Sequence, residues 1–161
     1  MPGRESERIN VISKLLNADI TSKNELQEMV ELASYICQTS MAMINLIDHQ
    51  TQHIRFKVGI KLSQLQKEDT FCQYIKNEDD LLVIPDALKD QRFYDNILVV
   101  NSPFVRFYAG LSLVTLDGLT IGSLCVLGNR AKELTASQKQ RLKVLSRRIV
   151  EIIEMEYGLV A

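Results

Sequence analysis

Cys72 is the residue of this 161-residue chain whose setting most directly suggests chemistry. Asp69 or Thr70 can cap a short helix over about residues 69–76, which would place Cys72 in its first turn. The positive end of a helix favours the thiolate, so we expect the pKa of Cys72 to be lowered. An activated thiol also needs a base and often a second cysteine nearby, and the segment 86–103 contains no cysteine. We therefore expect no catalytic residue, and a redox switch or thiol enzyme at Cys72 is kept as an alternative.

The other metal- and sulfur-chemistry signals are weak. His49 and His53 have the spacing of zinc ligands on a helix, but they fall on a turn and on a strand edge, where that geometry does not hold. The three cysteines are odd in number and lack CxxC spacing, which argues against a disulfide framework and a structural zinc site. We expect reduced thiols and no metal.

The segment between Pro85 and Pro103 is dense in Asp, Asn, Arg and aromatic residues, and irregular segments of this length are often functional. Its charged groups and the aromatic residues around it could hold a small molecule. The alternative is structural, with the charges pinning the loop and the aromatic rings filling the core. The candidate ligand-binding residues are Phe71, Cys72, Ile75, Asp86, Arg92, Phe93, Phe104, Arg106 and Tyr108.

The elements that must position these residues follow from hydrophobic periodicity and turn signals. Ser22 and Glu25 form a capping box before one helix, and Thr135 and Gln138 before the last. Asp117-Gly118 predicts a hairpin between two strands. The expected helices are 6–16, 22–37 and 135–156, and the expected strands are 41–47, 53–58, 81–84, 105–115 and 120–127.

The last helix carries more apolar surface than one small sheet requires. Its residues at heptad-like spacing are the candidate interface of a homodimer. They are Leu142, Leu145, Ile149 and Ile152.

Composition limits the class of protein. With 46% hydrophobic and 24% charged residues, the chain is typical of one globular domain. A net charge of -1 argues against nucleic acid as a partner. No apolar run of membrane-spanning length and no signal peptide is visible, so we expect no membrane partner and a cytoplasmic location.

The order of elements predicts an α+β fold, an antiparallel sheet with helices segregated to one face. Short sequence motifs add a resemblance to a known family. Arg106-Phe107-Tyr108-Ala109-Gly110, Asp117-Gly118 and the strand Ile121–Val126 resemble the second half of a GAF domain. Thr70-Phe71-Cys72, Val83–Ala87 and Asp90–Phe93 resemble its middle, and the resemblance covers about residues 25–156.

The resemblance implies a PAS-like sheet of five to six strands, with N- and C-terminal helices on one face and a helix/loop pocket on the other. It implies one domain over 1–161, with an N-terminal helix in 1–20 and a C-terminal helix in 135–157. Such modules sense rather than catalyse, pair through terminal helices, and accompany histidine kinases or cyclic-dinucleotide enzymes. Bilin-binding members of the family have a Cys-His pair at the attachment site, whereas Gln73 follows Cys72 in this chain. We therefore do not expect a covalently bound bilin.

The resulting hypothesis is a non-catalytic sensory module of bacterial signalling. It would bind an unidentified small molecule between the sheet and the 85–103 loop, and relay this through its terminal helices. The alternative from another class is a ligand-free dimerisation module whose own aromatic residues fill the pocket. A second alternative, implied by the resemblance, is a thiol-based redox switch or a methionine sulfoxide reductase-like enzyme at Cys72.

Overall fold

The computed structural model describes residues 2–17, 23–75 and 80–157. Six strands form one antiparallel sheet in the order β3-β2-β1-β6-β5-β4. The strands are β1 (Met41–Ile47), β2 (Thr51–Val58), β3 (Gln64–Gln66), β4 (Leu82–Ile84), β5 (Phe107–Val114) and β6 (Thr120–Gly128). The helices are α1 (Pro2–Asn17), α2 (Lys23–Cys37), α3 (Ile97–Val100) and α4 (Ala136–Tyr157), with 3-10 helices η1 (Lys67–Asp69), η2 (Cys72–Tyr74) and η3 (Ala87–Lys89). The expected α+β fold is confirmed.

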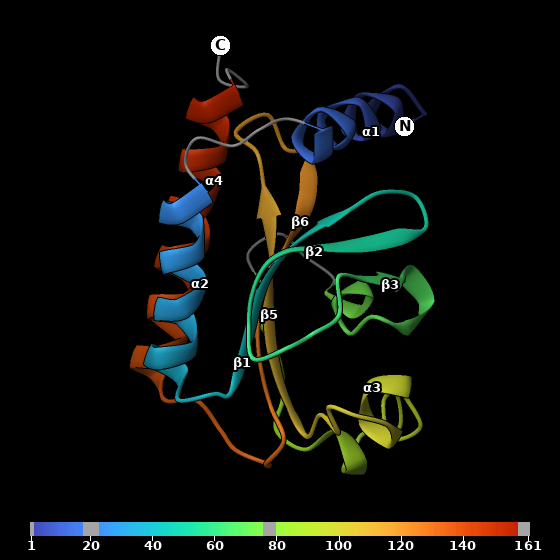
Figure 1. The fold of residues 1–161 in the computed structure, drawn as a ribbon, viewed down its shortest axis with the longest axis vertical. Helices are drawn as coiled ribbons and strands as arrows, with labels where there is room; N and C mark the ends of the chain where they lie inside the picture. The colour runs from blue at the N-terminus through green and yellow to red at the C-terminus, as the bar shows by residue number, and fades with distance from the viewer. Residues whose placement is uncertain (1, 18–22, 76–79, 158–161) are drawn as a thin grey trace.

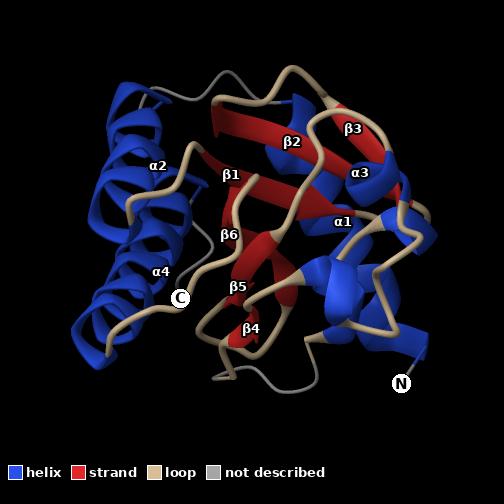
Figure 2. Cartoon of the chain, turned by 90° about the horizontal axis from the view of Figure 1, so that it is seen from below, coloured by secondary structure: helices blue, strands red, loops and turns tan. Residues whose placement is uncertain are grey.

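Helices α2 and α4 lie side by side over one face of the sheet (Figures 1 and 2). Each turns one apolar stripe to the strands, because residues three and four apart share a helix face. The stripe of α2 consists of Leu26, Val30, Ala33 and Cys37, and that of α4 includes Leu142, Leu145, Ile149 and Ile152. All eight are buried.

The heptad-like spacing on α4 is therefore explained by the core of this chain. Leu142, Leu145, Ile149 and Ile152 pack against the sheet and α2, so they are not exposed to a second chain. The large apolar side chains that the described part of α4 exposes are Val144 and Met155.

Helix α1 lies at the end of the sheet, against β6 and β1 (Figure 1). Ile12 and Leu15 enter the core shared with α2 and α4. Arg8 reaches the strand ends, where its guanidinium donates to the carbonyl of Ile47 at 2.6 Å and to that of Thr120 at 3.3 Å. The terminal helix is thereby tied to both central strands.

The opposite face of the sheet is covered by η2, η3 and α3 (Figure 1). Two expectations about this region need correction. The short helix expected over 69–76 is present only as the three-residue 3-10 helix η2, and residue 76 lies outside the described residues. The segment 85–103 is not irregular throughout, because it contains η3 and α3. Asp86 and Asn96 cap these two elements by accepting from the backbone N–H groups of Leu88 and Leu98.

The strongest local signals are confirmed. Thr135 and Gln138 exchange hydrogen bonds of 2.9 and 3.1 Å at the start of α4. β5 and β6 pair across a turn in which Gly118 has a φ of 88°, which glycine adopts without strain. The capping residue Ser22 lies outside the described residues. Within the described ranges no helix is long and apolar enough to cross a bilayer.

Candidate functional site

Three of the expected ligand-binding residues meet as one aromatic cluster on the face opposite α2 and α4. The rings of Phe71 and Phe93 lie edge to face with centroids 4.6 Å apart, and those of Phe71 and Tyr108 with centroids 4.9 Å apart. All three side chains are buried, and Phe93 is 0% exposed. These rings occupy the space between the sheet and the 85–103 segment, where the sequence predicted a ligand.

The charged candidate residues in and next to the 85–103 segment stabilise the conformation of this loop. Arg92 makes a bidentate ion pair with Asp90, with distances of 3.0 and 2.8 Å, which lowers the pKa of Asp90. The guanidinium of Arg106 donates to the carbonyl oxygens of Val99 and Val105. Asp86 is engaged in capping η3. The structural alternative considered for these charges therefore agrees with their contacts.

Phe104 does not join the aromatic cluster. Its side chain is 50% exposed, and its backbone is in the left-handed region with a φ of 58°. The sequence placed it on the wall of a pocket, whereas the structure places it on the surface.

The lowered pKa that the sequence predicts for Cys72 is contradicted. Its 3-10 helix has three residues, too few to provide a macrodipole, and the thiol is buried. The thiol donates a hydrogen bond to Oε1 of Gln52 at 2.7 Å. Burial raises the pKa of Cys72, the reverse of the sequence-based expectation. The thiol is thus held in its neutral form.

A row of polar side chains that sequence reasoning missed lies across the same face of the central strands. Nδ2 of Asn45 donates to Oγ of Ser123 at 3.1 Å, and that oxygen is 3.4 Å from Sγ of Cys125. The hydroxyl of Tyr108 is 3.2 Å from the same sulfur. Among the described residues, Oδ1 of Asn45 is the one buried side-chain oxygen or nitrogen without a partner. Buried polar groups normally find a partner, so this end of the row is open to one more donor.

The signal that could have revealed this row is the interruption of two apolar strands. Asn45 interrupts Met41–Ile47, and Ser123 interrupts Ile121–Leu127. A polar residue inside a buried strand requires a hydrogen-bond partner, and the register places these two directly opposite each other.

A cavity of about 170 Å³, called the Arg8 cavity below, opens beside this row. It brings Ser123 together with two of the expected site residues, Cys72 and Ile75, and with Arg8 from α1. The remaining wall consists of Ile47, Lys67, Thr70, Gln73, Ser112, Thr120 and Gly122. Hydroxyl and amide side chains border the cavity, although most of its lining surface is apolar. Lys67 supplies an exposed cation, which also interacts electrostatically with the carboxylate of Glu5.

Arg8 has a structural part in this cavity. Its guanidinium forms an ion pair with Glu5 at 2.9 Å in addition to its bonds with the strand-end carbonyls. Its donors are therefore already engaged, and Arg8 connects the cavity wall to α1. The glycine beside it is required for close packing, since a Cβ on Gly122 would lie 1.7 Å from the carbonyl oxygen of Asn45.

Comparison with known proteins adds three findings. The sequence pattern of the family described as GAF domain matches residues 23–153. A cyclic di-GMP phosphodiesterase of Pseudomonas aeruginosa is 35% identical over 126 residues, which are 78% of this chain. The match spans only 22% of that protein's length.

Solved structures agree on the fold. The GAF domain of an Acinetobacter phosphoenolpyruvate-protein phosphotransferase superposes with a TM-score of 0.68 over 96% of each chain, at 15% identity. A type II free methionine-R-sulfoxide reductase of Thermoplasma acidophilum superposes with a TM-score of 0.67, covering 84% of this chain and 94% of its own, at 10% identity. At these identities the likeness concerns the fold alone.

Proposed function

We propose that this chain, which belongs to the GAF domain family, senses a small molecule in the Arg8 cavity and relays its presence through α1. GAF domains are sensory and regulatory modules of signal-transduction proteins and are generally non-catalytic. The observation that carries the proposal is the shared cavity wall. A side chain of the terminal helix, Arg8, and the buried polar row through Ser123 border the same space.

The lining indicates the class of ligand. A space of about 170 Å³ is smaller than the roughly 300–1,000 Å³ of sites for drug-sized molecules, so the ligand is a small metabolite or a fragment of one. The hydroxyl groups of Thr70, Ser112 and Ser123 offer hydrogen bonds. Lys67, at the wall, favours a negative charge. We infer a small hydrogen-bonding molecule with one anionic group.

The relay follows from what Arg8 touches. A ligand that displaces the Arg8 side chain changes its bonds to Ile47 and Thr120, which attach α1 to β1 and β6. The position of α1 then depends on occupancy, and a ligand shifts a conformational equilibrium by its difference in affinity for the two states. We infer a cytoplasmic protein whose effector is a cyclic-dinucleotide enzyme or a histidine kinase. The similarity to a cyclic di-GMP phosphodiesterase favours the first.

Native mass spectrometry, with the denatured mass beside it, tests the binding. We expect a non-covalent adduct in the spectrum of the wild-type protein, and we expect Lys67→Glu to abolish it. Lys61→Glu makes the same charge change outside the cavity and should retain the adduct. Slower amide exchange in α1 when the ligand is present would support the relay. A spectrum without adduct, and no thermal shift with small carboxylates, phosphates or nucleobases at millimolar concentration, would contradict the proposal.

A second candidate, a ligand-free interaction module, is favoured by the aromatic cluster. Phe71, Phe93 and Tyr108 fill the volume that a ligand would occupy between the sheet and the 85–103 segment. For this candidate we expect an adduct-free homodimer in the same native spectrum. Its interface would then use exposed residues such as Val144 and Met155.

A further inference from the structure

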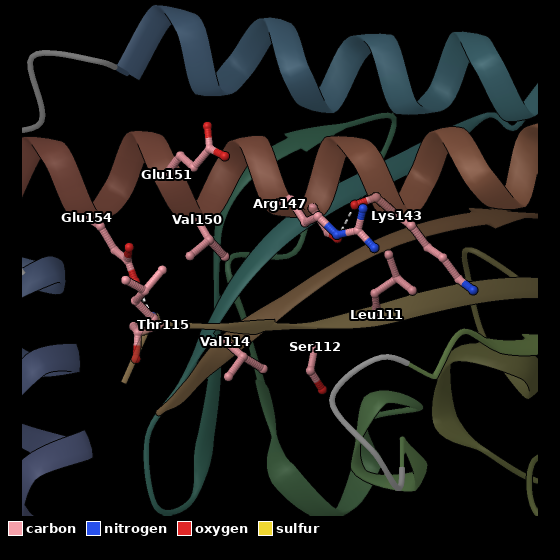
Figure 3. Close-up of a pocket in the computed structure, with 11 residues that line it drawn as sticks. Leu111, Ser112, Val114, Thr115, Lys143, Arg147, Val150, Glu151 and Glu154 are labelled. Carbon is pink, nitrogen blue, oxygen red and sulfur yellow. Dashed lines mark hydrogen bonds between the residues drawn. The ribbon is translucent and has the colours of Figure 1, made fainter. Parts of the chain in front are cut away.

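A second and larger cavity, called the α4 groove below, lies between β5 and α4 (Figure 3). It encloses about 400 Å³. One wall is the chain from Leu111 to Leu116, and the other is the face of α4 from Lys143 to Glu154. Among the described residues, only Ser112 lines both this groove and the Arg8 cavity.

The strand wall of the groove is a sheet edge. Successive strand residues point to opposite faces, and the groove is lined by both Leu111 and Ser112, which leave β5 on opposite sides in Figure 3. The groove therefore follows the edge of the strand. The pairing of β4 with β5 ends at Gly110, and in the described part of the chain no strand pairs with β5 beyond it on this side. Such an edge offers unpaired backbone groups to an added strand.

The helix wall of the groove carries charges of opposite sign at its two ends. Lys143 and Arg147 lie at the Leu111 end, and neither has a charged partner among the described residues (Figure 3). Glu154 lies at the Thr115 end and is 3% exposed, with its carboxylate accepting from the backbone N–H of Leu116. Glu151 also borders the groove, but its carboxylate forms an ion pair with Arg148 at 3.4 Å and points away from β5 in Figure 3, so the negative charge at this end is that of Glu154. The groove is thus positive where β5 enters it and negative where β5 leaves it.

The length of the groove corresponds to a short strand. Positions 143 and 154 are 11 residues apart on a helix, or about 16 Å at 1.5 Å per residue. An extended chain covers that distance with about five residues at 3.4 Å each.

We propose that the α4 groove binds an extended segment of a partner protein, which adds to the edge of β5 in the antiparallel direction. Antiparallel addition places the N-terminal end of the segment at Glu154 and its C-terminal end at Lys143 and Arg147. The segment therefore has a basic residue first and an acidic residue last. A central apolar residue would face Val150 and Leu111, because alternate residues of a strand point to one face.

Two peptides of identical composition test the proposal. The probe is the fluorescent, end-blocked peptide Lys-Thr-Val-Thr-Asp, and the control is the reversed peptide Asp-Thr-Val-Thr-Lys. When the control docks antiparallel, its Asp lies at Glu154 and its Lys lies at Lys143 and Arg147, so that like charges meet at both ends. Fluorescence anisotropy should give an affinity for the probe about tenfold or more above that of the control, and added salt should reduce this difference. Amide exchange at Leu111–Val114 should slow when the probe binds.

The protein variants provide the matched comparison. The double change Lys143→Glu and Arg147→Glu should weaken probe binding by about tenfold. Lys139→Glu with Arg141→Glu makes the same charge change on exposed positions of α4 outside the groove, and it should leave the affinity within about twofold. Circular dichroism confirms that both variants fold. Absence of binding at millimolar peptide, equal binding of the two peptides, or equal effects of the two variants would overturn the proposal.

Discussion

The ring of Tyr108 lies against the backbone of Gly110, two residues along the same strand. A Cβ built on Gly110 would lie 2.2 Å from the hydroxyl oxygen of Tyr108. The absent side chain thus leaves room for the ring, whose hydroxyl reaches the sulfur of Cys125 and which lies edge to face with the ring of Phe71. The aromatic cluster on this face of the sheet depends on one glycine.

The first prediction concerns that glycine. Gly110→Ala forces the buried Tyr108 ring to move, and overpacking of a core costs about 1–3 kcal/mol, so we expect the free energy of unfolding in urea to fall by this amount. Gly128→Ala is the matched control in the adjacent strand, because its Cβ would meet no atom within 4 Å. Equal losses in the two variants would show that the contact with Tyr108 does not constrain the strand.

The second prediction separates packing from charge in the 85–103 segment. Phe93 is 0% exposed and packs on Phe71, so Phe93→Ala should lower the free energy of unfolding by about 3–5 kcal/mol. Its neighbour Arg92 forms a partly exposed ion pair with Asp90, and such pairs contribute about 0.2–1 kcal/mol. Urea unfolding of Arg92→Ala should therefore stay close to wild type. A mild effect of Phe93→Ala would instead indicate an adaptable pocket wall.

The third prediction concerns α4, where adjacent positions differ in burial. Leu145 is 7% exposed and Val144 is 52% exposed. Leu145→Glu buries an unpaired carboxylate in the core, so we expect loss of the cooperative thermal transition rather than a folded monomer. Val144→Glu should retain the wild-type transition within about 0.5 kcal/mol. A folded Leu145→Glu variant that changes only in oligomeric state, measured by light scattering, would contradict the placement of Leu145.

The parts of the fold that could be predicted from the sequence are those with local causes. The capping box of Thr135 and Gln138 and the turn at Gly118 involve residues within a few positions of each other, so their spacing alone specifies them. The heptad-like spacing correctly predicted that α4 is an apolar helix, but it also suggested a homodimer interface at these positions. What it packs against is a tertiary property, and Leu145 and Ile149 proved to face the sheet of their own chain.

The candidate site was less predictable because its contacts are long-range. Arg8 meets Ile47 and Thr120, at distances in sequence that no local pattern encodes. The pKa of Cys72 was misjudged for a related reason. The sequence suggested the start of a helix, but the helix is one 3-10 turn. Burial of the thiol, which donates to Gln52 of β2, outweighs any favourable helix dipole.

The last prediction concerns alkaline pH and follows from the buried thiols. Burial raises the pKa of Cys37 from its ordinary value of 9.0 to about 11, and that of Cys125 to about 12. Above pH 9 the unfolded chain loses these protons while the folded chain keeps them, so the unfolded state binds fewer protons. Stability is then complete below pH 9 and falls as the pH rises toward 11 and 12.

The measurement is urea unfolding at intervals between pH 8 and pH 9.5. This window lies below the ordinary tyrosine pKa of 10.0, above which the buried Tyr108, whose pKa burial raises, would add a proton difference of the same sign. Each buried thiol steepens the loss by up to about 1.4 kcal/mol per pH unit once the unfolded thiol is ionised. Cys125→Ala is less stable at pH 8 because it creates a cavity, but it should show a shallower loss above pH 9, since one proton difference is gone. Parallel pH profiles for wild type and Cys125→Ala would mean that the Cys125 thiol ionises as readily in the folded chain as in the unfolded one.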